Sequence, residues 1–266
     1  MSFTLERDGA RLEGEEAGEG PVVVGLHGLT ATRRYVLMGS RTLERSGRRV
    51  VLYDARGHGA SAPAPLGDYS YAAQAADLAA VIASLDGGPA VVAIGASMGA
   101  HTALALALEQ PALLAGLVIV TPAHDPEHPR ADLEHWDALA RGLREGGVEG
   151  FVAAYGIERL PAAWRGTVET VLRQRIAAHE HPLAVADALA AVPRSRPFES
   201  WSALRSLALP TIVVASRDEA DPAHPLALAR RYAHEIPGAR LVIEEEGRSP
   251  IAWQGGQLSR LLLDFP

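Results

Sequence analysis

The sequence predicts an α/β protein built on a doubly wound, mostly parallel sheet, and two observations carry this prediction. Continuous apolar runs, suited to strands buried on both faces, alternate with stretches long enough for helices. One of these runs, 91–96, passes directly into Gly95-Ala96-Ser97-Met98-Gly99 and then into an Ala/Leu-rich stretch, 102–109. This strand, sharp turn and helix form the unit around which the rest of the chain is organised.

The other elements are expected in order along the chain. Residues 3–7 and 11–15 flank Asp8-Gly9, a hairpin signal, and are expected to form two antiparallel edge strands. Apolar runs predict further strands at 21–26, 49–53, 114–120 and 210–215. Helices are expected at 32–46, 71–85 and 226–236, and between 122 and 200 the strand pattern gives way to helices at 131–145, 148–155, 161–178 and 183–192.

Composition limits the classes of function. The 266 residues are 48% hydrophobic, enough for one substantial core, and the formal charge of −7 gives no basic surface for nucleic acid. No run is long enough to span a membrane, and the charged first residues argue against a signal peptide, so we expect a cytoplasmic protein, monomeric or homodimeric, acting on a small molecule. The chain has no Cys and no Lys, which excludes thiol nucleophiles and lysine bases. No metal cluster or dinucleotide motif is present, so no metal and no cofactor are expected.

Ser97 is the candidate nucleophile because of its place in the turn. A serine between a strand and a helix that meet this sharply has strained backbone, and Gly95 and Gly99 must be small to let the two backbones approach. Its Oγ would then be exposed at the N-terminus of a helix, where free N–H groups favour developing negative charge.

Three motifs, taken together and in order, resemble those of the α/β-hydrolase superfamily: Leu26-His27-Gly28, Asp54-Ala55-Arg56-Gly57-His58-Gly59-Ala60-Ser61, and the turn around Ser97. The resemblance implies a mostly parallel eight-stranded sheet flanked by helices, with a helical lid (122–200) inserted after the sixth strand into a core of residues 1–121 and 201–266. It also implies an oxyanion hole made by the backbone N–H groups of Leu29 and Met98. His27, His58 and Asp54 are expected to hold loops rather than to take part in catalysis.

The catalytic acid is expected in the loop after the strand at 210–215. The family commonly places Pro four residues after this acid, a pattern that both Asp218 and Asp221 satisfy. Asp221 is favoured because Asp-Pro-x-His-Pro leads into a helix as in family members, and Asp218 stays the alternative. Asp221 would also serve as a helix N-cap with Pro222 at the first helical position.

The sequence departs from the family at the general base. The loop at 247–250 reads Gly-Arg-Ser-Pro where relatives usually have His, and Arg248 has no acceptor nitrogen. We expect Arg248 to stand where the imidazole would be and to pair with Asp221, leaving the usual triad incomplete. Two histidines, His101 and His224, could act as a substitute base.

Three readings of the function follow from these residues. The first is a serine hydrolase that acts on a small, largely apolar ester or acyl compound through Ser97 with an atypical triad. The alternative is a non-catalytic pseudo-hydrolase that binds a ligand in the same pocket. The third is an enzyme of different chemistry on the same fold. A histidine within hydrogen-bond reach of Ser97 Oγ would favour the serine hydrolase.

Overall fold

The computed structural model describes residues 1–64, 67–85, 91–128, 132–217, 223–246, 253, 255–263 and 265. Its centre is an eight-stranded sheet in the order β1-β2-β4-β3-β5-β6-β7-β8. The pairs β1–β2 and β2–β4 are antiparallel, and all other neighbours are parallel. The fold class predicted from the sequence is therefore confirmed. The strands are β1 (Ser2–Arg7), β2 (Ala10–Ala17), β3 (Val22–Leu26), β4 (Arg49–Tyr53), β5 (Val91–Ala96), β6 (Leu114–Val120), β7 (Thr211–Ala215) and β8 (Arg240–Ile243).

The register of the central strands brings two of the sequence motifs together. Leu26 at the end of β3 pairs with Gly95, and Ala96 at the end of β5 pairs with Val120 at the end of β6. Parallel strands that end at the same level release their following residues at one edge of the sheet. The loop after β3 and the turn at Ser97 are therefore neighbours.

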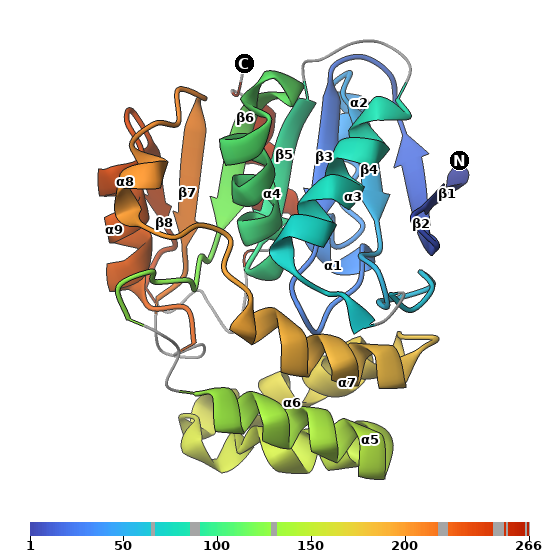
Figure 1. Cartoon of the computed structure of the whole chain (residues 1–266). Helices are drawn as coiled ribbons and strands as arrows, with labels where there is room; N and C mark the ends of the chain where they lie inside the picture. Colours follow the sequence, from blue (N-terminus) through green and yellow to red (C-terminus); the bar gives the residue numbers. More distant parts are fainter. Residues whose placement is uncertain are drawn as a thin grey trace.

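Helices cover both faces of the sheet (Figure 1). On one face, α3, α4, α8 and α9 pack on the strands through buried residues such as Leu78, Leu104 and Tyr232. On the other face, α1, α2 and α10 do so through residues such as Leu43 and Leu258. The helices are α1 (Arg34–Leu37), α2 (Thr42–Arg45), α3 (Tyr71–Ala83), α4 (Met98–Glu109), α5 (Leu133–Tyr155), α6 (Ala162–Ala177), α7 (Pro182–Ala191), α8 (Trp201–Leu204), α9 (Leu226–Glu235) and α10 (Gly255–Leu263), with short 3-10 turns at Pro111–Leu113, Ile157–Arg159 and Val192–Arg194.

The single helix expected at 32–46 is wrong: the structure has two short helices there, α1 and α2. Met38 ends α1 with φ 47°, and Gly39 follows with φ 76°. Two successive residues in the left-handed region cannot continue a right-handed helix. The chain therefore turns at this point, and α2 starts in a new direction.

A helical segment, residues 132–200, connects β6 to β7 and lies beyond one end of the sheet (Figure 1). Its first element, α5, is two helices joined at Gly147, where φ is 57°. The two parts fold back on each other, because a Cβ on Gly142 would lie 2.4 Å from the carbonyl oxygen of Gly150. The segment has its own apolar cluster, which also takes in Leu29 and Met98 from the sheet side. The helical segment and the sheet thus meet at Leu29 and Met98, close to Ser97.

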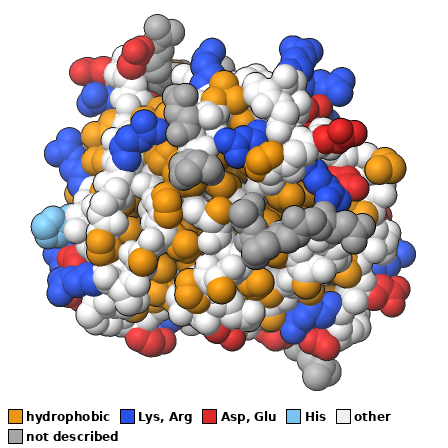
Figure 2. Space-filling model, turned by 90° about the horizontal axis from the view of Figure 1, so that it is seen from above, with side chains coloured by type: hydrophobic (Ala, Val, Ile, Leu, Met, Phe, Trp, Pro, Cys, Tyr) orange, Lys and Arg blue, Asp and Glu red, His pale blue; other side chains and the backbone are white. Residues whose placement is uncertain are grey.

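The opposite end of the molecule is seen in Figure 2, where apolar side chains lie across the middle of the face and charged side chains of both signs surround them. No described helix is both long and apolar enough to cross a membrane.

Candidate active site

Ser97 occupies the turn between β5 and α4 in a strained conformation. Its φ and ψ are 50° and −110°, a region that residues with a side chain rarely adopt. A Cβ on Gly95 would lie 2.3 Å from the Gly99 carbonyl carbon, and a Cβ on Gly99 would lie 2.5 Å from the Leu26 carbonyl oxygen. The two glycines are thus required by backbone contact, as the sequence predicts, and the turn exposes Ser97 to a cavity.

His224 is the histidine that the structure brings to Ser97. Its Nε2 lies 2.8 Å from Ser97 Oγ, within hydrogen-bond distance. His224 belongs to the short connection between β7 and α9, just before Pro225, so two segments 127 residues apart in sequence meet here. Ser97 therefore has an imidazole partner, although the sequence has Arg248 where family members usually have His. His224 was one of the two substitute bases that the sequence offered.

His101, the other candidate, has different partners. Its Nε2 accepts hydrogen bonds from the backbone N–H groups of Ala123 at 3.0 Å and His124 at 3.2 Å. Its Nδ1 lies 3.1 Å from the hydroxyl of Tyr71. The ring is buried on the first turn of α4 and forms part of the cavity wall, and these hydrogen bonds fix it there.

The other residues expected at the site lie outside the described residues. These are the favoured acid Asp221, the alternative acid Asp218 and Arg248. Nearby in the sequence, Glu244 follows β8 and is buried, and its Oε1 accepts a hydrogen bond from the backbone N–H of Arg217 at 2.6 Å. Glu244 therefore ties together the ends of β7 and β8, a contact that sequence reasoning missed.

The loop after β3 carries Leu29, whose N–H is one of the two expected oxyanion donors. Leu29 is buried against the cavity, and Met98, which holds the other expected donor, starts α4. The Leu29 N–H shares a peptide group with the Gly28 carbonyl, which accepts a hydrogen bond from His27 Nδ1 at 2.8 Å. The Met98 N–H likewise shares a peptide group with the Ser97 carbonyl, which accepts from the His101 N–H at 3.0 Å. Both peptide planes are thus held from their carbonyl side.

Three buried imidazoles hold this loop. Besides His27, the His58 Nε2 lies 2.8 Å from the Leu29 carbonyl, and the His179 Nε2 lies 3.3 Å from the Thr30 carbonyl. His179 comes from the connection between α6 and α7, and sequence reasoning missed it because nothing in its local sequence marks a contact 149 residues away. The carbonyls of three successive residues, 28–30, therefore each face a histidine ring.

Burial favours the neutral imidazole at His27 and His179. The Ala55 N–H donates to His27 Nε2 at 2.9 Å and the Gly59 N–H donates to His179 Nδ1 at 2.8 Å, so each ring has an acceptor nitrogen in use. Burial, followed by the proximity of His58, lowers the pKa of His27 to about 3 and the pKa of His179 to about 3. Burial also lowers the pKa of His58. Protonation would turn the two acceptor nitrogens into donors that face backbone N–H groups.

The cavity at Ser97 is small and mostly apolar. Its volume is about 40 Å³, room for roughly two or three water molecules. The helical segment contributes Trp136, Val192 and Pro193 to its lining. The described residues that line it are Leu29, Tyr71, Ser97, Met98, His101, Ala123, Trp136, Val192, Pro193, Ala223 and His224.

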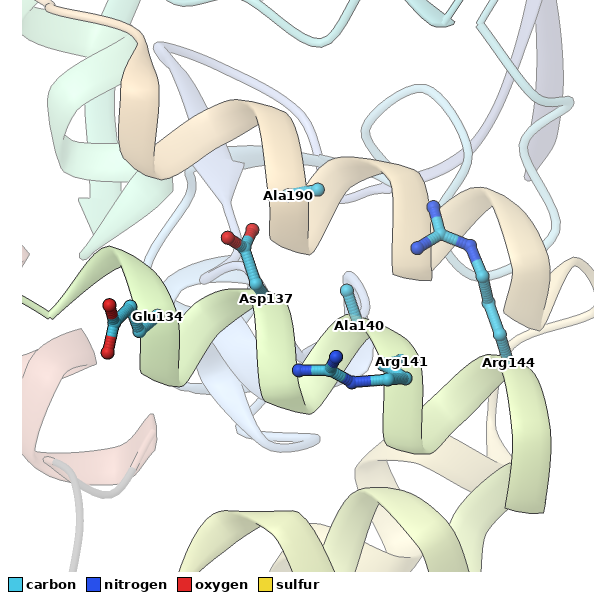
Figure 3. Close-up of a pocket in the computed structure, with 6 residues that line it drawn as sticks. All are labelled: Glu134, Asp137, Ala140, Arg141, Arg144 and Ala190. Carbon is cyan, nitrogen blue, oxygen red and sulfur yellow. The ribbon is translucent and has the colours of Figure 1, made fainter.

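A larger groove, of about 550 Å³, lies between α5 and α7 and shares no described residue with the Ser97 cavity. Figure 3 shows Asp137 and Arg144 reaching from α5 toward α7. Asp137 pairs with Arg194 at 2.8 Å, and Arg144 pairs with Asp187. The groove is a solvated surface of mixed charge, and its described lining contains no nucleophile. The smaller cavity is the candidate active site because Ser97 and His224 line it.

Among the described residues, one group has the composition of a metal site: Asp125, Glu127 and His128, whose ligand atoms lie within 4.8 Å of one another. Asp125 already accepts hydrogen bonds from the Glu127 N–H at 2.9 Å and from His128 Nδ1 at 2.9 Å. These hydrogen bonds are those of a surface turn after β6 and account for the close approach of the three side chains. None of the three residues lines the Ser97 cavity.

Comparison with known proteins agrees with the fold. A family model described as the alpha/beta hydrolase fold matches residues 21–156. The chain is 40% identical over 101 residues to the sn-1-specific diacylglycerol lipase ABHD11 of Mus musculus, which covers 38% of this chain and 32% of the lipase. It is 29% identical over 225 residues to the proposed carbamate hydrolase RutD of Variovorax paradoxus, which covers 84% of this chain and 83% of RutD. A thermophilic esterase from Thermogutta terrifontis has a TM-score of 0.72 at 27% identity, covering 92% of this chain and 89% of the esterase.

Proposed function

This chain belongs to the α/β-hydrolase family, and we propose that it is a serine hydrolase that cleaves a small, largely apolar ester or related acyl compound. Ser97 is the proposed nucleophile and His224 the proposed general base. The observation that carries the proposal is the 2.8 Å contact between His224 Nε2 and Ser97 Oγ, since a serine needs an adjacent acceptor for its proton to become an effective nucleophile.

The proposed reaction has two halves. His224 Nε2 takes the hydroxyl proton while Ser97 Oγ attacks the ester carbonyl carbon, and the carbonyl oxygen becomes an oxyanion that accepts hydrogen bonds from the N–H groups of Leu29 and Met98. Collapse of this intermediate breaks the bond to the alkoxide, which takes the proton from His224. A water molecule, deprotonated by the same imidazole, then attacks the acyl-Ser97 carbonyl. The bond to Ser97 Oγ breaks as this second intermediate collapses, Oγ takes the proton back from His224, and the acid is released.

We keep Asp221 as the proposed acid that would orient His224, with Asp218 as the alternative. Asp221 precedes His224 by three residues in the same connection, so a carboxylate near the imidazole Nδ1 requires no distant segment. Arg248 stays the proposed ion-pair partner of Asp221, as its loop in the sequence suggests. With His224 next to Ser97, the loop after β8 no longer has to supply a base.

The size of the cavity favours a small acyl group. A space of about 40 Å³ beside Ser97 does not admit a long chain unless its walls move. We propose that residues 122–200 act as a lid over a core of residues 1–121 and 201–266, since Trp136, Val192 and Pro193 of this segment line the cavity. Carbamates, the substrate class in the name of RutD, belong in the substrate panel beside short esters.

Labelling with a fluorophosphonate tests this function. We expect stoichiometric labelling of the wild type, none in Ser97→Ala, and normal labelling in the control Ser206→Ala, because Ser206 is exposed at the end of α8. His224→Gln should slow labelling strongly, whereas His234→Gln, at an exposed position of α9, should not. A folded wild type that neither takes up the probe nor hydrolyses any ester or carbamate of the panel would instead support the ligand-binding pseudo-hydrolase.

A further inference from the structure

His179 ties the helical segment to the loop that carries the Leu29 N–H. It lies in the connection between α6 and α7 and is only 8% exposed. Its Nδ1 accepts a hydrogen bond from the Gly59 N–H at 2.8 Å, and its Nε2 lies 3.3 Å from the Thr30 carbonyl oxygen. The next residue, Glu180, donates its N–H to the Gly59 carbonyl at 2.8 Å. The helical segment is thus held against the core at this point by a side chain and by the backbone.

The tautomer of this imidazole follows from its partners. Because His179 Nδ1 accepts the Gly59 N–H, the proton of the neutral ring is on Nε2. The Nε2–H therefore donates to the Thr30 carbonyl. A protonated ring would set a second N–H against the Gly59 N–H, and burial lowers the pKa of His179 to about 3. At the pH of an ester assay, the Thr30 carbonyl thus faces a hydrogen-bond donor in a fixed position.

From Thr30 the hydrogen bonds continue to the proposed oxyanion hole. The Thr30 carbonyl shares a peptide group with the Ala31 N–H, which donates to the Gly28 carbonyl at 2.9 Å. The Gly28 carbonyl in turn shares a peptide group with the Leu29 N–H, the proposed oxyanion donor. Peptide groups are planar, and each hydrogen bond in such a chain polarises the next. A donor on the Thr30 carbonyl therefore orients and strengthens the Leu29 N–H at the other end of the chain.

A second contact joins the same end of α6 to the chain that follows β3. The guanidinium of Arg175, four residues before His179, lies 5.3 Å from the centroid of the Tyr35 ring in α1. The Tyr35 N–H donates to the Thr32 carbonyl at 2.9 Å, which keeps this ring close to the loop. The end of α6 and the loop after β3 are therefore held together at two places.

We propose that His179 is a positioning residue of the hydrolase: it couples the lid, residues 122–200, to the oxyanion hole by holding the loop that aims the Leu29 N–H. The inference rests on the proposed hydrolase function and extends it, because the lid then supports the catalytic geometry as well as lining the cavity. An oxyanion donor acts in the transition state. Loss of its position therefore lowers kcat and leaves KM near the wild-type value.

Two substitutions separate the two hydrogen bonds of His179. The amide of Asn reaches the position of Nδ1 and can accept from the Gly59 N–H, whereas the amide of Gln reaches the position of Nε2 and can donate to the Thr30 carbonyl. Removing an oxyanion donor outright costs about 10²- to 10³-fold in kcat, and here the donor is kept but loses its support. We therefore expect kcat for p-nitrophenyl acetate to fall about 10-fold in His179→Asn, with KM within about twofold of wild type. In His179→Gln, kcat should stay within about threefold of wild type. Circular dichroism shows whether each variant is folded.

A trifluoromethyl ketone tests the oxyanion hole directly, because the adduct that forms when Ser97 Oγ adds to its carbonyl carries an oxyanion. Its Ki should rise about 10-fold in His179→Asn, in parallel with the fall in kcat, which a merely structural role would not produce. The control is His181→Asn, the same substitution at the N-cap of α7, where the His181 carbonyl accepts from the Ala184 N–H at 3.0 Å within the helix. It should leave kcat and Ki within about twofold of wild type.

Three results would overturn this inference while the wild type still reacts with the fluorophosphonate, so that the proposed function stands. The first is wild-type kcat and Ki in a folded His179→Asn. The second is a larger loss of kcat in His179→Gln than in His179→Asn, which would mean that His179 only anchors the helical segment at Gly59. The third is a fall in kcat with an unchanged Ki, which would place the effect outside the oxyanion hole. A folded wild type that neither takes up the probe nor hydrolyses any ester or carbamate would overturn the proposed function, and the inference with it.

Discussion

Acid should destabilise this protein through the buried histidines that hold residues 28–30. The pKa of His27 and of His179 is about 3 in the folded state, against 6.5 in an unfolded chain. Between these values the unfolded chain binds protons that the folded protein does not, so stability is full above pH 6.5 and falls as the pH drops toward 3. At pH 5 each histidine costs about 2 kcal/mol of unfolding free energy, or about 4 kcal/mol together, at about 1.4 kcal/mol per pH unit and per proton.

Urea unfolding at pH 7, 6 and 5 measures this loss. His179→Gln removes one of the two groups, so its unfolding free energy should fall by about 2 kcal/mol less than that of the wild type between pH 7 and 5. The comparison uses the change with pH and not the absolute stability, so a cost of the substitution itself does not interfere. The exposed His234 provides the control, and His234→Gln should follow the wild type. If the unfolding free energy of His179→Gln fell with acid as steeply as that of the wild type, the claim that His179 is a buried neutral imidazole would be refuted.

Three further predictions concern the site. Trp136→Ala, which opens the cavity wall, should raise kcat/KM for p-nitrophenyl octanoate relative to the acetate by about 10-fold, as one bulky group leaves an apolar pocket; an unchanged chain-length profile would argue against the lid. Asp221→Asn should lower kcat about 10²-fold or more while Asp218→Asn stays near wild type, and the reverse pattern would make Asp218 the acid. Arg248→His should change ester hydrolysis by less than about threefold, because His224 already contacts Ser97; a rise of about 10²-fold would mean that the base is missing in the wild type.

Most of the fold could be predicted because its signals are local. Apolar runs such as 114–120 and the Gly95-to-Gly99 turn each specify their own structure through burial or close backbone contact. The break between α1 and α2 was missed because Met38 takes a left-handed conformation that its side chain does not favour. The short helix α8 and the terminal helix α10 were also not foreseen, since each is stabilised by packing on the sheet.

The site could be predicted only in part, because several of its residues come from segments that are distant in the sequence. Ser97 could be identified because the residues that strain it are its own neighbours. The choice between His101 and His224 could not be made, because it depends on where the connection after β7 meets the end of β5. Tyr71 and His179 were missed because their roles come from segments that approach the site only in the folded protein.

The central claim is that His224 is the base that activates Ser97, and the rate of ester hydrolysis in His224→Gln tests it most directly. Wild type, His224→Gln and the surface control His234→Gln would be compared on p-nitrophenyl acetate at pH 8, with circular dichroism to show that each is folded. We predict that kcat falls by about 10²- to 10⁴-fold in His224→Gln, the contribution of a positioned general base, and stays within about twofold in His234→Gln. A folded His224→Gln variant that hydrolyses the ester at the wild-type rate would contradict the claim.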